Sequence, residues 1–312
     1  MAHDYIRILV WGMFVTLAYN LCADMLRAIG DSVTPLIFLV IAAVTNIVLD
    51  YLFIGSFSMG VSGAACATVL SQLVSAVLCF LRIRSGFPIL HISKNDLEWD
   101  RERMRLLYQN RLAMALMSSL VNCGTLILQT GINKLGTNII VAHTAARKIT
   151  EIYMIMFMVF GQTMATFCGQ NMGAGKFDRI KEGMKLAIIY TCAWSTLAMI
   201  ASYTIGPQLV YMVTGTHKEA VITNATNYLK FDTLFYYVTC VISVLRNVMQ
   251  GMGDRVTPLI SSGLEMVGKV VIAATLVPWL DYTGVIIAEP IVWFIMVIPL
   301  IVEIRKTPLF EK

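Results

Sequence analysis

The chain has 312 residues, of which 57% are hydrophobic and 14% are charged, and its formal net charge is +5. Soluble domains carry about 25% charged residues, so this composition excludes an ordinary soluble protein and predicts a polytopic protein of the lipid bilayer. In such a protein the positive charge indicates loop topology rather than nucleic-acid binding. The seven cysteines lie singly in apolar segments, which predicts neither a zinc site nor a disulfide framework.

Apolar segments long enough to cross a bilayer as helices, about 20 residues each, run through the whole chain. We predict nine of them, at 5–28, 34–57, 62–84, 107–132, 139–168, 184–206, 228–250, 257–280 and 283–304. Helices are expected because lipid offers no partner to backbone N–H and C=O groups, which must be paired within the segment. The predicted fold class is therefore an all-α integral membrane protein.

An internal repeat relates the beginning and the end of the chain. The stretch GDSVTPLI at 30–37 returns as GDRVTPLI at 253–260, an offset of 223 residues with seven of eight positions identical. Each copy has a long apolar segment, a tight polar turn and two more apolar segments, a pattern typical of pseudo-symmetric transporters. Thr34 and Thr257, which precede prolines, are the expected helix N-caps.

The charged segment 85–105 is predicted to be a cytoplasmic linker. It separates a partial N-terminal lobe of three spans (1–84) from a C-terminal lobe of six spans (106–312). Spans four to six lie directly before the second repeat copy, and no corresponding spans lie before the first. The chain is therefore expected to match the last nine spans of a twelve-span protein with two pseudo-symmetric six-helix lobes. A genuine nine-span transporter is the alternative.

Lysine and arginine are distributed unevenly between the two sets of loops. With the N-terminus outside, 17 of the 24 lie in inside loops or at the inner ends of spans, six lie outside, and Lys269 lies within a span. Cytoplasmic loops are enriched in these residues. We therefore predict a multi-pass protein of the cell's inner (plasma) membrane with its C-terminus in the cytoplasm.

The glycine-rich stretch from Gly169 to Arg179 is predicted to be a polar loop after the fifth span. It lacks the Gly-Lys-Ser/Thr ending of a phosphate-binding loop, and a tight helix-to-helix turn is expected instead. No nucleotide or other cofactor is therefore expected. The sequence also lacks a nucleophile–base or metal-ligand constellation, so the chain is not predicted to be an enzyme.

Candidate ion-binding residues lie in the first lobe. Asn46 and Asp50 share one helix face at i, i+4 spacing, and a carboxylate within a membrane usually faces a cavity or a partner. Asp50 could take up a proton or, with Asn46 and the Thr68 hydroxyl, offer oxygens to Na⁺. A buried hydrogen-bond cluster that only joins two helices is the alternative. Asp24 could join this site, although pairing with Arg27 at i+3 is favoured.

Candidate substrate or proton residues lie in the second lobe. Glu265 and Lys269 are an i, i+4 pair deep in the eighth span. This pair could serve function, as charged residues within a membrane often do. Alternatively, it is a neutralised pair that only stabilises the lobe. Glu289 precedes Pro290 in the last span, next to an expected kink. His143 is expected at the membrane interface.

Four short motifs resemble those of the multidrug and toxic compound extrusion (MATE) family. They are LRAIGD at 26–31 with Pro35, NIVLD at 46–50, GAACAT at 63–68 and GQNMGAG at 169–175. The resemblance covers the whole chain, matched to family helices four to twelve. It implies two six-helix lobes facing each other in a V, of which the first lacks its first three helices here.

The resemblance implies a secondary active antiporter that exports drugs or toxic amphipathic, often cationic, small molecules in exchange for H⁺ or Na⁺. Asn46, Asp50 and Thr68 match the family's cation-site positions. Some members also carry acids on the seventh and tenth helices. Gln129 is the polar candidate on the former, and Asp232 on the latter lies near the outer end, so no second-lobe ion site is transferred.

Two alternatives stay open. A lipid-linked oligosaccharide flippase of the same superfamily would need a strongly cationic cavity to hold pyrophosphate. Against it, Lys269 is the one clearly basic residue within the predicted spans. A non-functional fragment is the other alternative, because the chain lacks the acid that the family carries on its first helix.

Overall fold

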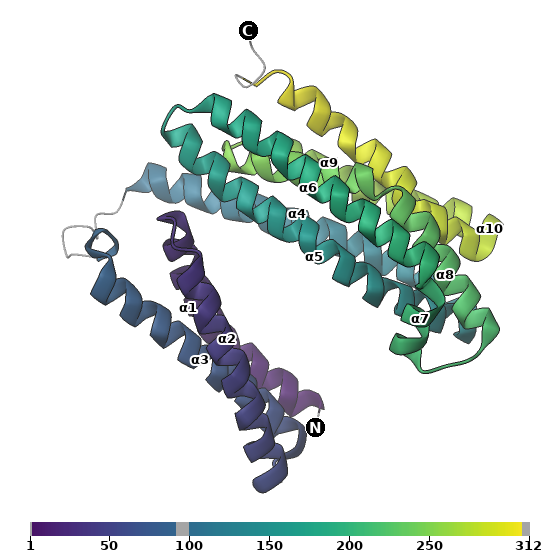
Figure 1. Ribbon diagram of the computed structural model, residues 1–312, viewed down its shortest axis with the longest axis horizontal. Helices are drawn as coiled ribbons and strands as arrows, with labels where there is room; N and C mark the ends of the chain where they lie inside the picture. The colour runs from purple at the N-terminus through teal and green to yellow at the C-terminus, as the bar shows by residue number, and fades with distance from the viewer. Residues whose placement is uncertain (1, 92–99, 308–312) are drawn as a thin grey trace. The chain divides into compact units, whose positions relative to one another are not determined.

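The computed structural model describes residues 2–91 and 100–307, which form helices joined by short turns, with no strand among them (Figure 1). The predicted all-α fold class is confirmed. The chain divides into two compact units, Met1–Trp99 and Asp100–Lys312. The boundary falls within the segment predicted to be the linker, of which residues 92–99 lie outside the described residues.

The N-terminal unit is built from the long helices α1 (Ala2–Ala28), α2 (Val33–Asp50) and α3 (Gly60–Gly86), followed by a 3-10 turn, Pro88–Leu90. α3 packs against both α1 and α2. A small core joins α1 and α3 and consists of Tyr19, Ala23, Leu26, Ala76, Cys79 and Ile83. Only Pro35 and Ala42 of α2 are buried, and large apolar side chains form much of its exposed surface, as expected of a helix in lipid.

α2 continues beyond Asp50 in a different form. The next residues make a π-helical turn, Tyr51–Ser56, and the whole stretch Val33–Ser56 supplies the 24 residues of a candidate membrane span. π-helical turns inside helices occur frequently at functional sites. This one begins directly after the predicted ion-binding carboxylate.

The C-terminal unit contains the remaining helices of the described residues. They are α4 (Arg101–Ile132), α5 (Thr137–Gly173), α6 (Phe177–Thr204), α7 (Gly206–Thr214), α8 (Glu219–Leu234), α9 (Tyr236–Gly251) and α10 (Val256–Ile304). The span predicted at 228–250 begins earlier, at Glu219, and bends by 55° between α8 and α9. The short helix α7 was not predicted.

The polar loop predicted from Gly169 to Arg179 is wrong in extent. α5 continues to Gly173 and α6 begins at Phe177, so only residues 174–176 form a turn. Gly175 has a left-handed φ of 68°, and the next N–H donates to a carbonyl five residues earlier at 2.8 Å. This Schellman ending pairs the last carbonyls of α5, which is why the glycine-rich stretch stays helical.

α10 is a hairpin of two spans. As a straight helix its 49 residues would measure about 74 Å, whereas a bilayer core is about 30 Å thick. The chain reverses at Asp281, whose φ of 50° and ψ of −132° are not helical. The two halves then meet: the Ser261 hydroxyl donates to the Met296 carbonyl at 2.9 Å.

The number of spans follows from this reversal. Seven helices of the described residues are long and apolar enough to cross a membrane, and the bent α8–α9 pair forms an eighth candidate. Dividing α10 at Asp281 adds one more. The total is the predicted nine, with α10 accounting for the spans predicted at 257–280 and 283–304.

The two copies of the repeat turn have the same backbone geometry. Gly30 and Gly253 adopt left-handed φ values of 95° and 89°, which a side chain would strain. In each copy the N–H of the following aspartate, Asp31 or Asp254, donates to the carbonyl five residues earlier at 2.9 Å. Both helices before the repeat motif therefore end in a Schellman motif.

The helices after these turns are capped by aspartate, so the predicted threonine N-caps are wrong. Thr34 donates its N–H to Asp31 Oδ1 at 3.1 Å and its hydroxyl to Oδ2 at 2.7 Å. Thr257 donates its N–H to Asp254 Oδ1 at 3.2 Å. A carboxylate is a stronger acceptor than a hydroxyl and takes the cap. The hydrogen bond from the Thr34 hydroxyl, and to a smaller extent the one from its N–H, lowers the pKa of Asp31 below its usual value.

The second turn of each copy preserves the repeat as well. Ser58 and Asp281 are the non-glycine residues with positive φ in the described part of the chain, at 52° and 50°. They lie 223 residues apart, the offset of the repeat motif. The pseudo-symmetry therefore extends to backbone conformation at a position where the residue types differ.

Candidate functional site

Asn46 and Asp50 lie half-buried on one face of α2 in the N-terminal unit. Asn46 Nδ2 and Asp50 Oδ1 are buried and have no hydrogen-bond partner among the described residues. Leaving such an atom unpaired costs about 1–3 kcal/mol, so the position calls for a proton, an ion or a water molecule. Rotation of the Asn46 amide by about 180° would exchange its nitrogen for an oxygen acceptor.

The other two predicted first-lobe residues make separate local contacts. Thr68, on α3, donates its hydroxyl to the Ala64 carbonyl of its own helix at 2.9 Å, which leaves its lone pairs available. Asp24 forms an ion pair with Arg27 at 2.7 Å, and both side chains are exposed. The structure thus places the Asn46–Asp50 pair together and shows the salt-bridge arrangement for Asp24.

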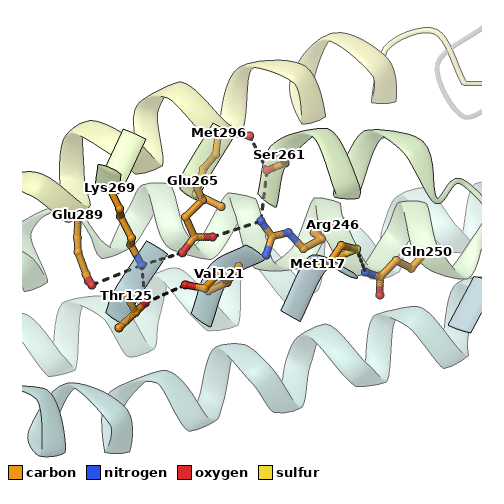
Figure 2. A network of polar contacts seen from close by, with 10 residues as sticks. All are labelled: Met117, Val121, Thr125, Arg246, Gln250, Ser261, Glu265, Lys269, Glu289 and Met296. Atoms are coloured by element: carbon orange, nitrogen blue, oxygen red, sulfur yellow. Dashed lines mark hydrogen bonds and ion pairs between the residues drawn. The ribbon is translucent and has the colours of Figure 1, made fainter. Parts of the chain in front are cut away.

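Charged side chains meet inside the C-terminal unit in what we call the C-terminal charge network. Its members are Arg147, Arg246, Glu265, Lys269 and Glu289. Lys269 lies at the centre: its Nζ is 2.9 Å from Glu265 Oε1 and 4.0 Å from Glu289 Oε1. It also donates to Thr125 Oγ1 of α4 at 3.2 Å (Figure 2).

An arginine closes each end of this network. Arg147 of α5 lies 2.9 Å from Glu289, and Arg246 of α9 lies 3.8 Å from Glu265. The network therefore joins α5, α9 and both halves of α10. It contains three cations and two carboxylates, and the buried acid Asp232 interacts electrostatically with Arg147, Lys269 and Glu289. Charges inside a membrane protein are costly and are usually paired or functional.

Neither arginine of this network was predicted to be a polar-site residue. In the count of loop charges Arg147 was placed at an outer and Arg246 at an inner span end, yet Arg147 lies ten residues inside α5 and Arg246 lies within α9. Lys269 is therefore not the one basic residue within the spans. Gln129, by contrast, donates to Asn133 of its own helix at 2.9 Å, and no described contact links it to the network.

Two further polar residues, each expected near the end of a span, are buried among packed helices. Asp232, expected near the outer end of its span, is 0% exposed and accepts a hydrogen bond from the Tyr236 hydroxyl at 3.1 Å. His143, expected at the interface, is buried edge-on against the rings of Tyr228 and Tyr282, at centroid distances of 5.3 and 6.0 Å. Both residues follow the packing of α5, α8 and α10, which apolar periodicity alone does not reveal.

The polar groups of the described residues do not resemble a transition-metal site. No three His, Cys, Asp or Glu side chains of that part of the chain lie together, and its cysteines are all free thiols. Asn46, Asp50 and Thr68 instead carry hard oxygen atoms, the type of ligand that alkali cations bind.

Apolar spans, a repeated helical arrangement and charges buried between the spans define this chain as a multi-pass α-helical membrane protein. The family model MatE matches residues 1–52 and 113–275. The chain belongs to this family, the MATE family that its motifs resemble.

Two relatives illustrate the similarity. The probable multidrug resistance protein YpnP of Bacillus subtilis (strain 168) is 25% identical over 287 residues, covering 91% of this chain and 63% of the relative. The FAD transporter of Shewanella oneidensis is 26% identical over 208 residues, covering 64% of this chain and 45% of the relative. The chain thus spans less than two thirds of either relative. Relatives of this kind are not enzymes, which confirms that prediction.

Solved structures show the same fold. The crystal structure of MATE in the bent conformation matches with a TM-score of 0.89 and 22% identity, over 98% of this chain and 69% of the other. The outward-facing conformation of a multidrug resistance MATE family transporter of the MOP superfamily also gives a TM-score of 0.89, with 21% identity over 99% and 70%.

Proposed function

We propose that this chain serves in a secondary active antiporter that exports drugs or other amphipathic small molecules in exchange for H⁺ or Na⁺. The observation that carries the proposal is the Asn46–Asp50 pair, whose buried polar atoms lack partners among the described residues of a membrane-spanning helix. The multidrug resistance named for relatives supports the substrate class. The excess of Lys and Arg in the predicted inner loops favours a plasma-membrane protein with a cytoplasmic C-terminus.

Asp50 is the group whose charge changes in this mechanism. Binding of a proton or of Na⁺ neutralises a carboxylate that is costly inside a membrane. Neutralisation changes the relative free energies of the conformations that expose Asp50 to the two sides. A cation can shift that equilibrium only by the difference in its affinity for the two conformations. Coupling therefore requires that Asp50 binds the cation more tightly in one of them.

The test is Asp50→Asn, which keeps the shape of the side chain and removes its charge and its proton affinity. Efflux of ethidium is measured in a drug-sensitive bacterial host and in vesicles under an imposed H⁺ or Na⁺ gradient. We expect cation-dependent efflux to fall to background. Whichever gradient drives efflux in the unmodified protein identifies the coupling ion.

Asp178→Asn is the matched control, because Asp178 is exposed in the first turn of α6. It removes the same charge and should leave ethidium efflux unchanged. Unchanged efflux in Asp50→Asn, at normal expression, would contradict the proposed role of Asp50.

A further inference from the structure

A pocket of about 310 Å³ lies between α4, α9 and the first half of α10. It is lined by Met117, Ser118, Val121, Asn122, Arg246 and Ser262. Arg246 is the charged member of this lining, and no carboxylate lines the pocket. Figure 2 shows Arg246 at the end of the C-terminal charge network, close to Met117 and Val121. We call it the Arg246 pocket.

The charge of Arg246 is only partly neutralised. Its Nη2 lies 3.8 Å from Glu265 Oε2, which is beyond hydrogen-bond distance. Glu265 is already bound by Lys269 at 2.9 Å, and Glu289 is bound by Arg147 at 2.9 Å. Arg246 is therefore the cation of the network without a close carboxylate partner.

The pocket also contains hydrogen-bond donors that have no partner among the described residues. Arg246 Nε and Ser262 Oγ are both buried and unpaired there, and Ser262 is 0% exposed. Arg246 Nη2 makes one long hydrogen bond, to Ser261 Oγ at 3.3 Å. Ser118 and Asn122 lie one helical turn apart on α4 and add polar groups to the opposite wall. Unpaired buried donors on and beside an arginine that has no close carboxylate partner are complementary to an anion.

We propose that the Arg246 pocket binds the anionic head group, a carboxylate or a phosphate, of an amphipathic organic anion that the protein transports. A guanidinium matches such groups with two parallel hydrogen bonds, and the apolar part of the ligand would contact Met117 and Val121. The inference rests on the proposed transport function and adds organic anions to its substrates.

The test measures binding to the purified protein in phosphatidylcholine nanodiscs, with empty nanodiscs as the blank. The probes are dansylglycine, which carries a carboxylate, and dansylglycinamide, its neutral amide. We expect the unmodified protein to bind the carboxylate about tenfold or more tightly than the amide, because charge-assisted hydrogen bonds favour the anion. Arg246→Gln should remove this preference, and Arg179→Gln, at an exposed arginine of α6, should keep it.

Two milder variants keep the test decisive if Arg246→Gln does not fold. Arg246→Lys retains the charge without the planar fork and should weaken the preference several-fold. Ser262→Ala should weaken carboxylate binding by about two- to tenfold and leave amide binding unchanged. Equal binding of both dyes by the unmodified protein would overturn the proposal, and so would an undiminished preference in both milder variants.

Further outcomes distinguish this proposal from a lipid head-group site and from the antiport proposal. If phosphatidylglycerol in the nanodisc displaces dansylglycine through Arg246, the pocket is a lipid head-group site, and its assignment to a substrate is overturned. Intact anion binding without any cation-driven ethidium efflux would contradict the antiport proposal alone. Ethidium efflux without anion preference would contradict this proposal alone.

Discussion

At the residue scale, Lys269 holds the C-terminal charge network together. Its ammonium group lies 2.9 Å from Glu265 and 4.0 Å from Glu289, and it donates to Thr125 at 3.2 Å. Taking these charges out of water is costly, and their attraction offsets the cost only while each has a partner. Removing one charged side chain should therefore lower the free energy of unfolding more than removing it together with its oppositely charged partner.

Lys269→Met keeps the length of the side chain and removes its charge. We expect it to lower the free energy of unfolding by about 3–5 kcal/mol, because Glu265 loses its closest buried partner. The double variant Glu265→Gln/Lys269→Met should lose clearly less than the sum of the two single changes. Thermal unfolding in detergent, followed by a thiol-reactive fluorophore that reports exposure of the buried Cys168 and Cys240, measures this.

Lys185→Met is the control, since Lys185 is exposed on α6 and its loss should change stability by less than about 0.5 kcal/mol. Strictly additive effects of the single Glu265 and Lys269 variants would show that the ion pair contributes nothing, and the network would then need another explanation.

The contacts of these residues also show which ion pairs can be predicted from spacing in the sequence. Glu265 and Lys269 are four residues apart on one helix, and that spacing alone predicts their contact. Arg147 and Glu289 are 142 residues apart, and no local sequence pattern predicts a contact between residues so far apart. Arg246 was assigned to the inner end of its span because it lies four residues before the predicted end at residue 250. The predicted polar site was therefore incomplete where its contacts depend on helix packing.

At the scale of elements, hydropathy and turn residues predicted most of the helices. Glycine and aspartate at the repeat turns mark the ends of α1 and α9, and the two halves of α10 match two predicted spans. The bend between α8 and α9 was missed because neither glycine nor proline marks Phe235. The π-helical turn Tyr51–Ser56 was also missed, although it contains Gly55.

Close packing inside the α10 hairpin gives a sharp prediction. A Cβ atom at Gly284 would lie 2.6 Å from the carbonyl oxygen and 2.8 Å from the carbonyl carbon of Leu276. These are backbone atoms, which cannot rotate aside. We expect Gly284→Ala to lower the free energy of unfolding by about 1–3 kcal/mol, measured by the midpoint of thermal unfolding in detergent.

Gly263→Ala is its matched control in the first half of the same hairpin. Nothing lies within 4 Å of a Cβ atom there, and alanine favours a helix over glycine by up to about 1 kcal/mol. This variant should be as stable as the unmodified protein or more stable. Equal losses in both variants would mean that the two halves of α10 do not approach closely at Gly284.

At the scale of the whole molecule, the repeat, whose copies are offset by 223 residues, predicts the membrane topology. The two Gly-Asp turns share their backbone geometry, and so do the turns at Ser58 and Asp281. Six predicted spans separate the beginnings of the two copies. An even number of crossings means that both copies begin on the same side of the membrane.

Reporter fusions at three points of α10 test this topology without reference to either terminus. Because α10 is a hairpin, fusions after Gly253 and after Thr307 should lie on one side of the membrane and a fusion after Asp281 on the other. The excess of Lys and Arg places the first two in the cytoplasm. A green fluorescent protein should therefore fluoresce after Gly253 and Thr307, and alkaline phosphatase should be active after Asp281. Opposite sides for Gly253 and Thr307 would mean that α10 crosses once, whereas a reversed pattern at all three points would leave the hairpin intact and invert the orientation.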